Sequence, residues 1–209
     1  MSADHEYSVI GHSRAVVGRY LGTVAAALAA AGAVAAAAFL RWFDTLHTSV
    51  TVPDVVLWPV TAAAVFAVVL TAFDKLVWRW PLVRRFIGIP DLNGVWTVDG
   101  VTTGGAETPL GTGWTGEITI SQSWERIWVH LRTPNSSSRS KAAALMREPG
   151  VGHCLMYSYR NEPRMGEPMQ AHVGYAELVF DESLSSADGE YFNSKGRVSF
   201  GRMNLKRKS

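Results

Sequence analysis

The chain has 209 residues and a formal charge of +2, so it can hold one domain or two. Residues 1–87 carry seven Lys/Arg and five Asp/Glu, whereas residues 88–209 carry thirteen of each. Because a polyanion binder usually has a clear basic excess, this balance argues against a nucleic acid polymer as the main partner. The single cysteine, Cys154, excludes an intrachain disulfide framework and fits a reducing compartment.

Two long apolar segments, residues 20–40 and 55–73, contain no charged residue. A helix rises ~1.5 Å per residue, so about 20 apolar residues cross the ~30 Å hydrocarbon core of a bilayer. Tryptophan and tyrosine lie near the ends of both segments, where amphipathic rings favour the headgroup region. Residues 1–87 are therefore predicted to form a transmembrane helical hairpin. A signal peptide in the first segment and a buried soluble hairpin are the alternatives.

The cationic side chains that flank these segments predict their orientation. Arg14 and Arg19 precede the first segment, and the second is followed by Lys75, Arg79, Arg84 and Arg85. The connecting residues 41–54 contain one Arg and two Asp. Since short cytoplasmic flanks are enriched in Lys/Arg, both termini and residues 88–209 are predicted to be cytoplasmic.

The first apolar segment also carries small residues at helical spacing, namely Gly18, Gly22, Ala26 and Ala30. Such a face lets two helix backbones approach closely and favours self-association in the bilayer. We name these four residues the small-residue face. The alternative is that alanine is only a weakly hydrophobic filler and the helix pairs solely within its own hairpin.

Residues 88–209 change to a period of two. Short alternating runs, rich in β-branched and aromatic residues, lie at 92–98, 114–122, 125–133, 153–160, 171–181, 189–193 and 197–205. With an extended segment at 138–147 the total is about eight strands, and residues 193–196 fit a hairpin turn. Strands in this order predict an antiparallel meander that closes into a small β-barrel, with a two-layer sandwich as the alternative. The expected fold is thus membrane-anchored and all-β.

Alternation also predicts which side chains face the interior of this barrel. The inward set is Ile118, Ile120, Gln122, Ile127, Val129, Leu131, Leu155, Tyr157, Tyr159, His172, Gly174, Ala176, Leu178, Val198, Phe200 and Arg202. Its polar members must either satisfy one another or meet a polar ligand. Trp96 on the first strand and Arg202 on the last are expected to stack and close the barrel by a cation–π contact.

No catalytic constellation is evident in the sequence. His153 and Cys154 are adjacent, but a structural zinc site needs four ligands and the chain has one cysteine. The glycines at 111–116 do not follow a strand and open a helix, as a dinucleotide fingerprint requires. We therefore expect no enzyme activity, no cofactor and no metal.

Behind the two apolar segments, a series of short motifs follows in a fixed order. These are "IPDLNGVW", "ISQSWERIWVHL", "TPNSSSRS", "YSYRNEP", "MQAHVGYAELVF", "GEYFN" and "GRVSF". In this order the chain resembles the two-transmembrane, β-strand-rich effectors of bacterial CBASS antiphage systems. The resemblance implies that a cytoplasmic β-barrel senses a cyclic dinucleotide made by a partner nucleotidyltransferase. It further implies that the chains then oligomerise and disrupt the inner membrane, in which they are multi-pass proteins.

Several polar and aromatic residues are compatible with that ligand. Phosphates are bound by arginine and hydroxyl donors, and bases by aromatic faces and polar edges. The candidate contacts are Ser136, Ser138, Arg139, Ser140, Tyr157, Tyr159, Arg160, Asn161 and His172. The serine-rich stretch at 133–141 has two other interpretations, a structural strand and turn or a disordered loop.

Two other classes of function stay open at this point. One is a membrane-tethered, lipocalin-like carrier of an apolar small molecule, and the other is a structural assembly module with a filled barrel and no ligand. The polar interior set argues against the apolar carrier.

Overall fold

The computed structural model describes residues 4–11, 13–44, 54–105 and 111–208. It contains nine strands: β1 (His5–Ile10), β2 (Gly94–Gly105), β3 (Thr112–Gln122), β4 (Arg126–Arg132), β5 (Ser136–Glu148), β6 (Gly152–Pro163), β7 (His172–Phe180), β8 (Ser186–Ser194) and β9 (Ser199–Arg207). Its helices are α1 (Arg14–Asp44), α2 (Asp54–Lys75), the 3-10 turn η1 (Val77–Arg79) and α3 (Pro81–Ile87). The chain divides into two compact units, residues 13–80 and residues 1–12 with 81–209.

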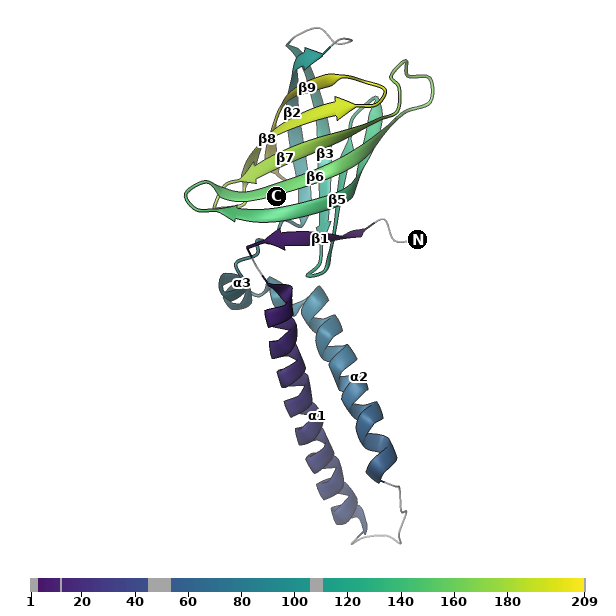
Figure 1. Ribbon diagram of the computed structural model, residues 1–209, viewed down its shortest axis with the longest axis vertical. Coiled ribbons are helices and arrows are strands. Elements are labelled where there is room, and N and C mark those ends of the chain that lie inside the picture. Colours follow the sequence, from purple (N-terminus) through teal and green to yellow (C-terminus); the bar gives the residue numbers. More distant parts are fainter. Residues whose placement is uncertain (1–3, 12, 45–53, 106–110, 209) are drawn as a thin grey trace. The chain divides into compact units, whose positions relative to one another are not determined.

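The second of these units is built on one closed sheet with the strand order β1-β4-β3-β2-β9-β8-β7-β6-β5 (Figure 1). Strands β2 to β9 form the predicted meander of eight, each pairing antiparallel with its neighbour in sequence. Strand β9 returns to pair with β2, which brings the two ends of the meander together. The prediction of a mostly β fold for residues 88–209 is confirmed.

Strand β1 was not predicted, and it corrects two expectations. It pairs antiparallel with β4 and parallel with β5, at Tyr7↔Ala143 to Ile10↔Met146, so the sheet is not wholly antiparallel. It also places the first residues of the chain in the sheet unit, whereas the predicted boundary assigned residues 1–87 to the helical part. Strands β4 and β5 pair only from His130 to Arg132, and β1 completes the sheet where they separate.

Side chains from the sheet and β1 satisfy one another around this junction. Tyr7 is buried, and its hydroxyl donates to the carbonyl of Ser123 at 3.3 Å while it accepts from Gln122 Nε2 at 3.1 Å. His5 Nε2 lies 2.7 Å from the Ser140 hydroxyl. The N-terminal strand thus supplies polar partners to Gln122, Ser123 and Ser140 of the sheet.

One half of the sheet interior is filled with apolar side chains. The largest of these are Trp96, Ile118, Ile120, Ile127, Leu145, Leu155, Leu178, Phe180 and Leu205. Trp96 and Phe180 meet edge to face with ring centroids 5.1 Å apart, which is a favourable aromatic geometry. This end of the sheet therefore supplies the core, and the inward set predicted for β3, β4, β6 and β7 is confirmed.

The predicted orientation of β9 is wrong. Val198, Phe200 and Arg202 are exposed, and the inward residues of β9 are Ser199, Gly201, Met203 and Leu205. Because the side-chain period of a strand is two, a one-residue error reverses both faces. Arg207, not Arg202, lies over the Trp96 ring, with its guanidinium carbon 5.3 Å from the ring centroid.

In the other unit, α1 presents an apolar surface over more than a bilayer's length. Among the described residues, one helix is long and apolar enough to cross a membrane, in the 22-residue segment Arg14–Ala35. The predicted second span, residues 55–73, lies within α2, but the side chains of residues 54–62 fall outside the described part, as do most of residues 41–54. The second span and the orientation of the hairpin stay predictions.

Candidate functional site

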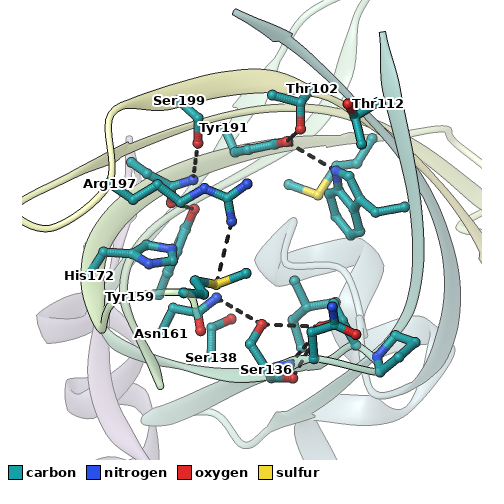
Figure 2. Close-up of a pocket in the computed structure, with 18 of the residues that line it drawn as sticks. Thr102, Thr112, Ser136, Ser138, Tyr159, Asn161, His172, Tyr191, Arg197 and Ser199 are labelled. Atoms are coloured by element: carbon teal, nitrogen blue, oxygen red, sulfur yellow. Dashed lines mark hydrogen bonds between the residues drawn. The ribbon is translucent and has the colours of Figure 1, made fainter. Parts of the chain in front are cut away.

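The other half of the sheet interior is hollow. A cavity of about 430 Å³ opens where β2, β4, β6 and β8 end and β3, β5, β7 and β9 begin. This volume lies in the usual range of ~300–1,000 Å³ for small-molecule sites. Its lining includes Thr102, Trp114, Ser136, Ser138, Tyr157, Tyr159, Asn161, His172, Tyr191, Asn193, Arg197 and Ser199 (Figure 2).

Six of the nine predicted ligand contacts line this cavity. They are Ser136, Ser138, Tyr157, Tyr159, Asn161 and His172. The serine-rich stretch is an ordered hairpin, in which Thr133 N–H donates to the Ser136 carbonyl at 2.9 Å and β5 follows directly. The disordered-loop interpretation is therefore wrong. The other two interpretations are compatible, because Ser136 and Ser138 belong to strand β5 and also line the cavity.

The other three predicted contacts do not line the cavity. Arg139 and Arg160 are exposed on the outer face of the sheet, where Arg160 Nε lies 3.5 Å from a Glu162 carboxylate oxygen. Ser140 is buried, but its hydroxyl accepts from Val129 N–H at 3.0 Å and contacts His5. Strand alternation explains why both arginines face outward. Arg139 lies between the inward Ser138 and Ser140, and Arg160 lies between the inward Tyr159 and Asn161.

Residues missed by sequence reasoning form the opposite wall. Trp114 Nε1 donates to the Tyr191 hydroxyl at 3.0 Å, and the Thr102 hydroxyl lies 3.0 Å from the same oxygen. Asn193 Nδ2 donates to the Ser199 hydroxyl at 2.9 Å. The spacing of Tyr191 and Asn193 in "GEYFN" is the signal that these two side chains share one face of a strand.

A cationic side chain, Arg197, lies in the link between β8 and β9. It is the one Lys or Arg among the described residues that line the cavity, and its Nη1 lies 3.4 Å from the Met169 sulfur. Figure 2 shows its guanidinium directed across the mouth of the cavity. Arginine binds phosphate through its planar array of N–H donors.

Burial favours the neutral forms of Tyr157, Tyr159 and His172. It raises the pKa of Tyr157 and Tyr159 well above the ordinary tyrosine value, so both hydroxyls stay protonated. Burial also lowers the pKa of His172. His172 Nδ1 lies 2.9 Å from the Gln170 carbonyl, so it carries the hydrogen and leaves Nε2 as an acceptor.

One buried acceptor in the wall has no protein partner. Asn161 Nδ2 donates to the Ser136 hydroxyl at 3.2 Å, while Asn161 Oδ1 is buried and lacks a hydrogen bond within the described residues. A buried polar atom without a partner costs about 1–3 kcal/mol, so a ligand that donates to it gains this amount. The cavity thus offers a guanidinium, hydroxyl donors, two acceptors and aromatic faces from Trp114 and the tyrosines.

Residues 87–207 match the protein family described as Cap15, cyclic dinucleotide receptor domain. The chain belongs to this family. CD-NTase-associated protein 15 from Yersinia aleksiciae is 38% identical over 205 residues, which cover 97% of this chain and 97% of the relative. The predicted resemblance to CBASS effectors that sense a cyclic dinucleotide is confirmed at the level of the family.

The family is described as a receptor domain. Burial, with a smaller effect of Glu177, raises the pKa of the Cys154 thiol, the one cysteine of the chain, to about 12. A thiol with such a pKa is protonated at neutral pH and is a poor nucleophile. The adjacent His153 and Cys154 are therefore not an activated pair.

Proposed function

We propose that this chain is an antiphage effector whose cavity binds a cyclic dinucleotide second messenger. The observation that carries the proposal is the division of the sheet interior, filled with apolar side chains at one end and, at the other, hollow and lined by polar and aromatic residues. A filled structural module has no need of such a hollow. An apolar carrier would line it with aliphatic side chains instead.

Ligand chemistry supports this assignment. A cyclic dinucleotide carries two phosphodiester anions and two bases, and Arg197 with the neighbouring hydroxyls suits the anions. The rings of Tyr157 and Tyr159, whose centroids lie 5.9 Å apart, suit a base face. Asn161 Oδ1 and His172 Nε2 suit the N–H edges of a base, since both accept hydrogen bonds.

The membrane part of the proposal rests on sequence and on α1. We propose that α1 and α2 span the bacterial inner membrane as a hairpin, with both termini and the sheet unit, a β-barrel, in the cytoplasm. Ligand-bound copies then oligomerise, and their helices disrupt the bilayer. The small-residue face is available for this step, because Gly18, Ala26 and Ala30 are exposed and Gly22 is half-buried.

Two arginines provide the test of the ligand site. Arg197→Gln removes the cation of the cavity, whereas Arg139→Gln removes an exposed arginine of the outer face. A hydrogen bond to a charged group is worth ~1.5–3 kcal/mol, so the first substitution should weaken binding about 10-fold to 100-fold or more. Calorimetric titration of the full-length protein in detergent with a panel of cyclic dinucleotides measures this.

The second variant is the matched control and should bind as the wild type does. Equal losses in both variants would remove Arg197 from the site. Binding of a fluorescent fatty acid, with no response to any dinucleotide, would favour the apolar carrier.

A further inference from the structure

Helix α3 is the first element of the sheet unit after the helical unit, and it has three distinct faces. It begins at Pro81, and proline suits the first turn of a helix. Gly88 follows its last residue with a φ of 66°, a value that few residues other than glycine adopt. Gly88 N–H donates to the Arg84 carbonyl at 2.8 Å and caps the helix. Ile87 is buried and fixes α3 within its unit.

The second face of α3 borders a basic hollow. This hollow of about 280 Å³ is lined by Arg84 and Arg85 of α3, by Arg147 of β5 and by His153 of β6, and Glu182 is the one acidic residue among its described lining. Three guanidinium groups against one carboxylate give it a positive potential. Arg84 Nε and His153 Nδ1 are buried and lack hydrogen-bond partners within the described residues. An anion with several oxygen acceptors would satisfy both.

The third face of α3 is apolar and open to solvent. Leu82 and Phe86 stand one turn apart, so they share a face, and they are 84% and 79% exposed. Arg85 lies between this face and the hollow on the helical circuit. Large apolar side chains beside a basic surface are the pattern of helices that lie in a membrane interface.

We propose that α3 and the basic hollow dock the sheet unit onto an anionic bilayer surface. A phospholipid phosphate occupies the hollow against Arg84, Arg147 and His153, while Leu82 and Phe86 enter the boundary between headgroups and acyl chains. A soluble phosphate would account for the hollow but not for the apolar pair, which gains only from an apolar environment. The charge excess selects anionic lipids, because juxtamembrane arginines are attracted to a negative leaflet.

Chain length supports the same assignment. Only residues 76–80 separate the end of α2 at Lys75 from Pro81, so a membrane-spanning α2 delivers α3 to the interface. This step rests on the proposed function. The docking itself is independent of the dinucleotide cavity, which opens at the opposite end of the strands.

A single-cysteine label tests the docking in the full-length protein. Cys154 is fully buried and has a raised pKa, so a thiol-reactive fluorophore will label Leu82→Cys selectively. The protein is placed in lipid nanodiscs that contain brominated acyl chains, either zwitterionic only or with anionic phospholipid added. Quenching of the Leu82→Cys label should be several-fold stronger with anionic lipid, and Arg84→Gln with Arg147→Gln should abolish the difference.

Three further measurements make the outcome decisive. A label at Phe192→Cys, on an exposed aromatic of β8, should stay unquenched in all lipids. A label at Val24→Cys within α1 should be quenched in both lipid types, which tests the proposed span separately. Equal Leu82→Cys quenching with and without anionic lipid overturns the proposal. The proposal is also overturned if inorganic phosphate changes the emission of the Leu82→Cys label and anionic lipid does not. That result would assign the hollow to a soluble anion.

Discussion

The Tyr159 hydroxyl of β6 donates a hydrogen bond to Asn193 Oδ1 of β8 at 2.8 Å, across the whole width of β7. The residue of β7 between them is Gly174, which pairs with both Tyr159 and Asn193. A Cβ atom at Gly174 would lie 2.5 Å from the Tyr159 hydroxyl and 2.7 Å from the Phe192 carbonyl oxygen. The missing side chain is therefore what lets the phenol cross β7 and complete the cavity wall.

Gly174→Ala should consequently displace Tyr159 and damage the site. Overpacking of this kind costs about 1–3 kcal/mol, and loss of the tyrosine position should weaken dinucleotide binding as well. Thermal unfolding of the full-length protein in detergent, followed by near-UV circular dichroism, measures the first effect and calorimetry the second. Gly113→Ala is the stability control, because a Cβ there meets only one atom, at 4.0 Å. Equal melting of the two variants would contradict the argument.

A second prediction concerns the seam between β2 and β9. The Arg207 guanidinium stacks on the buried Trp96 ring, and it also donates to the Asn93 carbonyl. Arg207→Ala should therefore lower the free energy of unfolding by at least the ~0.5–2 kcal/mol of the cation–π contact. Arg202→Ala is the matched control, because its side chain is 76% exposed and only pairs with Glu190 at 3.2 Å. A surface pair contributes ~0–1 kcal/mol, so urea titration of the two variants should separate them.

Strand alternation placed two residues of the first of these contacts correctly, and for the second it selected the wrong arginine. Alternation correctly placed Tyr159 and Gly174 inside, and for Gly174 the charged Glu177 of the same strand, β7, marks the outward face. It failed on β9, where Val198 and Phe200 are apolar yet face outward, and hydrophobicity then selected the wrong phase. Arg202 marks the outward face of β9, but two apolar residues in the same phase, Val198 and Phe200, outweighed it. Exposed apolar side chains are common on protein surfaces, so hydrophobicity alone does not fix the orientation of a short strand.

The larger omission was β1. Six residues with mixed polarity ahead of an apolar segment carry little periodic signal, and their parallel pairing with β5 depends on contacts more than 130 positions away. Arg197 was missed for another reason: the predicted strand 197–205 included it, but the reversed phase turned it outward, whereas it lies in the link before β9 and lines the cavity. Sequence therefore predicted the meander and six cavity residues, whereas long-range pairing and link geometry required the three-dimensional structure.

The pH dependence of stability follows from the buried histidines. Burial lowers the pKa of His172, and also those of His130 and His153, below the ordinary value of 6.5. The unfolded chain then binds protons more readily than the folded one, so this contribution is lost as the pH falls below about 6.5. The melting temperature should decline from about pH 7 to pH 5, and His172→Gln should make the decline shallower. An unchanged slope in His172→Gln would show that its ring is solvated.

The last prediction joins ligand binding to the membrane. Gly22 lies on the small-residue face of α1, and a Cβ atom at Gly22 or Gly18 meets nothing within 4 Å in the described structure. A Cβ atom at Gly22 therefore has room within one copy of the chain, whereas the larger side chain of Gly22→Leu holds apart two helix backbones that approach through this face. We expect the variant to bind dinucleotide normally and to lose ligand-dependent dye release from liposomes. Val24→Leu, a conservative change on the opposite side of α1, should leak as the wild type does. Undiminished release from Gly22→Leu would exclude this face as the interface, and release that ignores ligand would show that the cavity is not the switch.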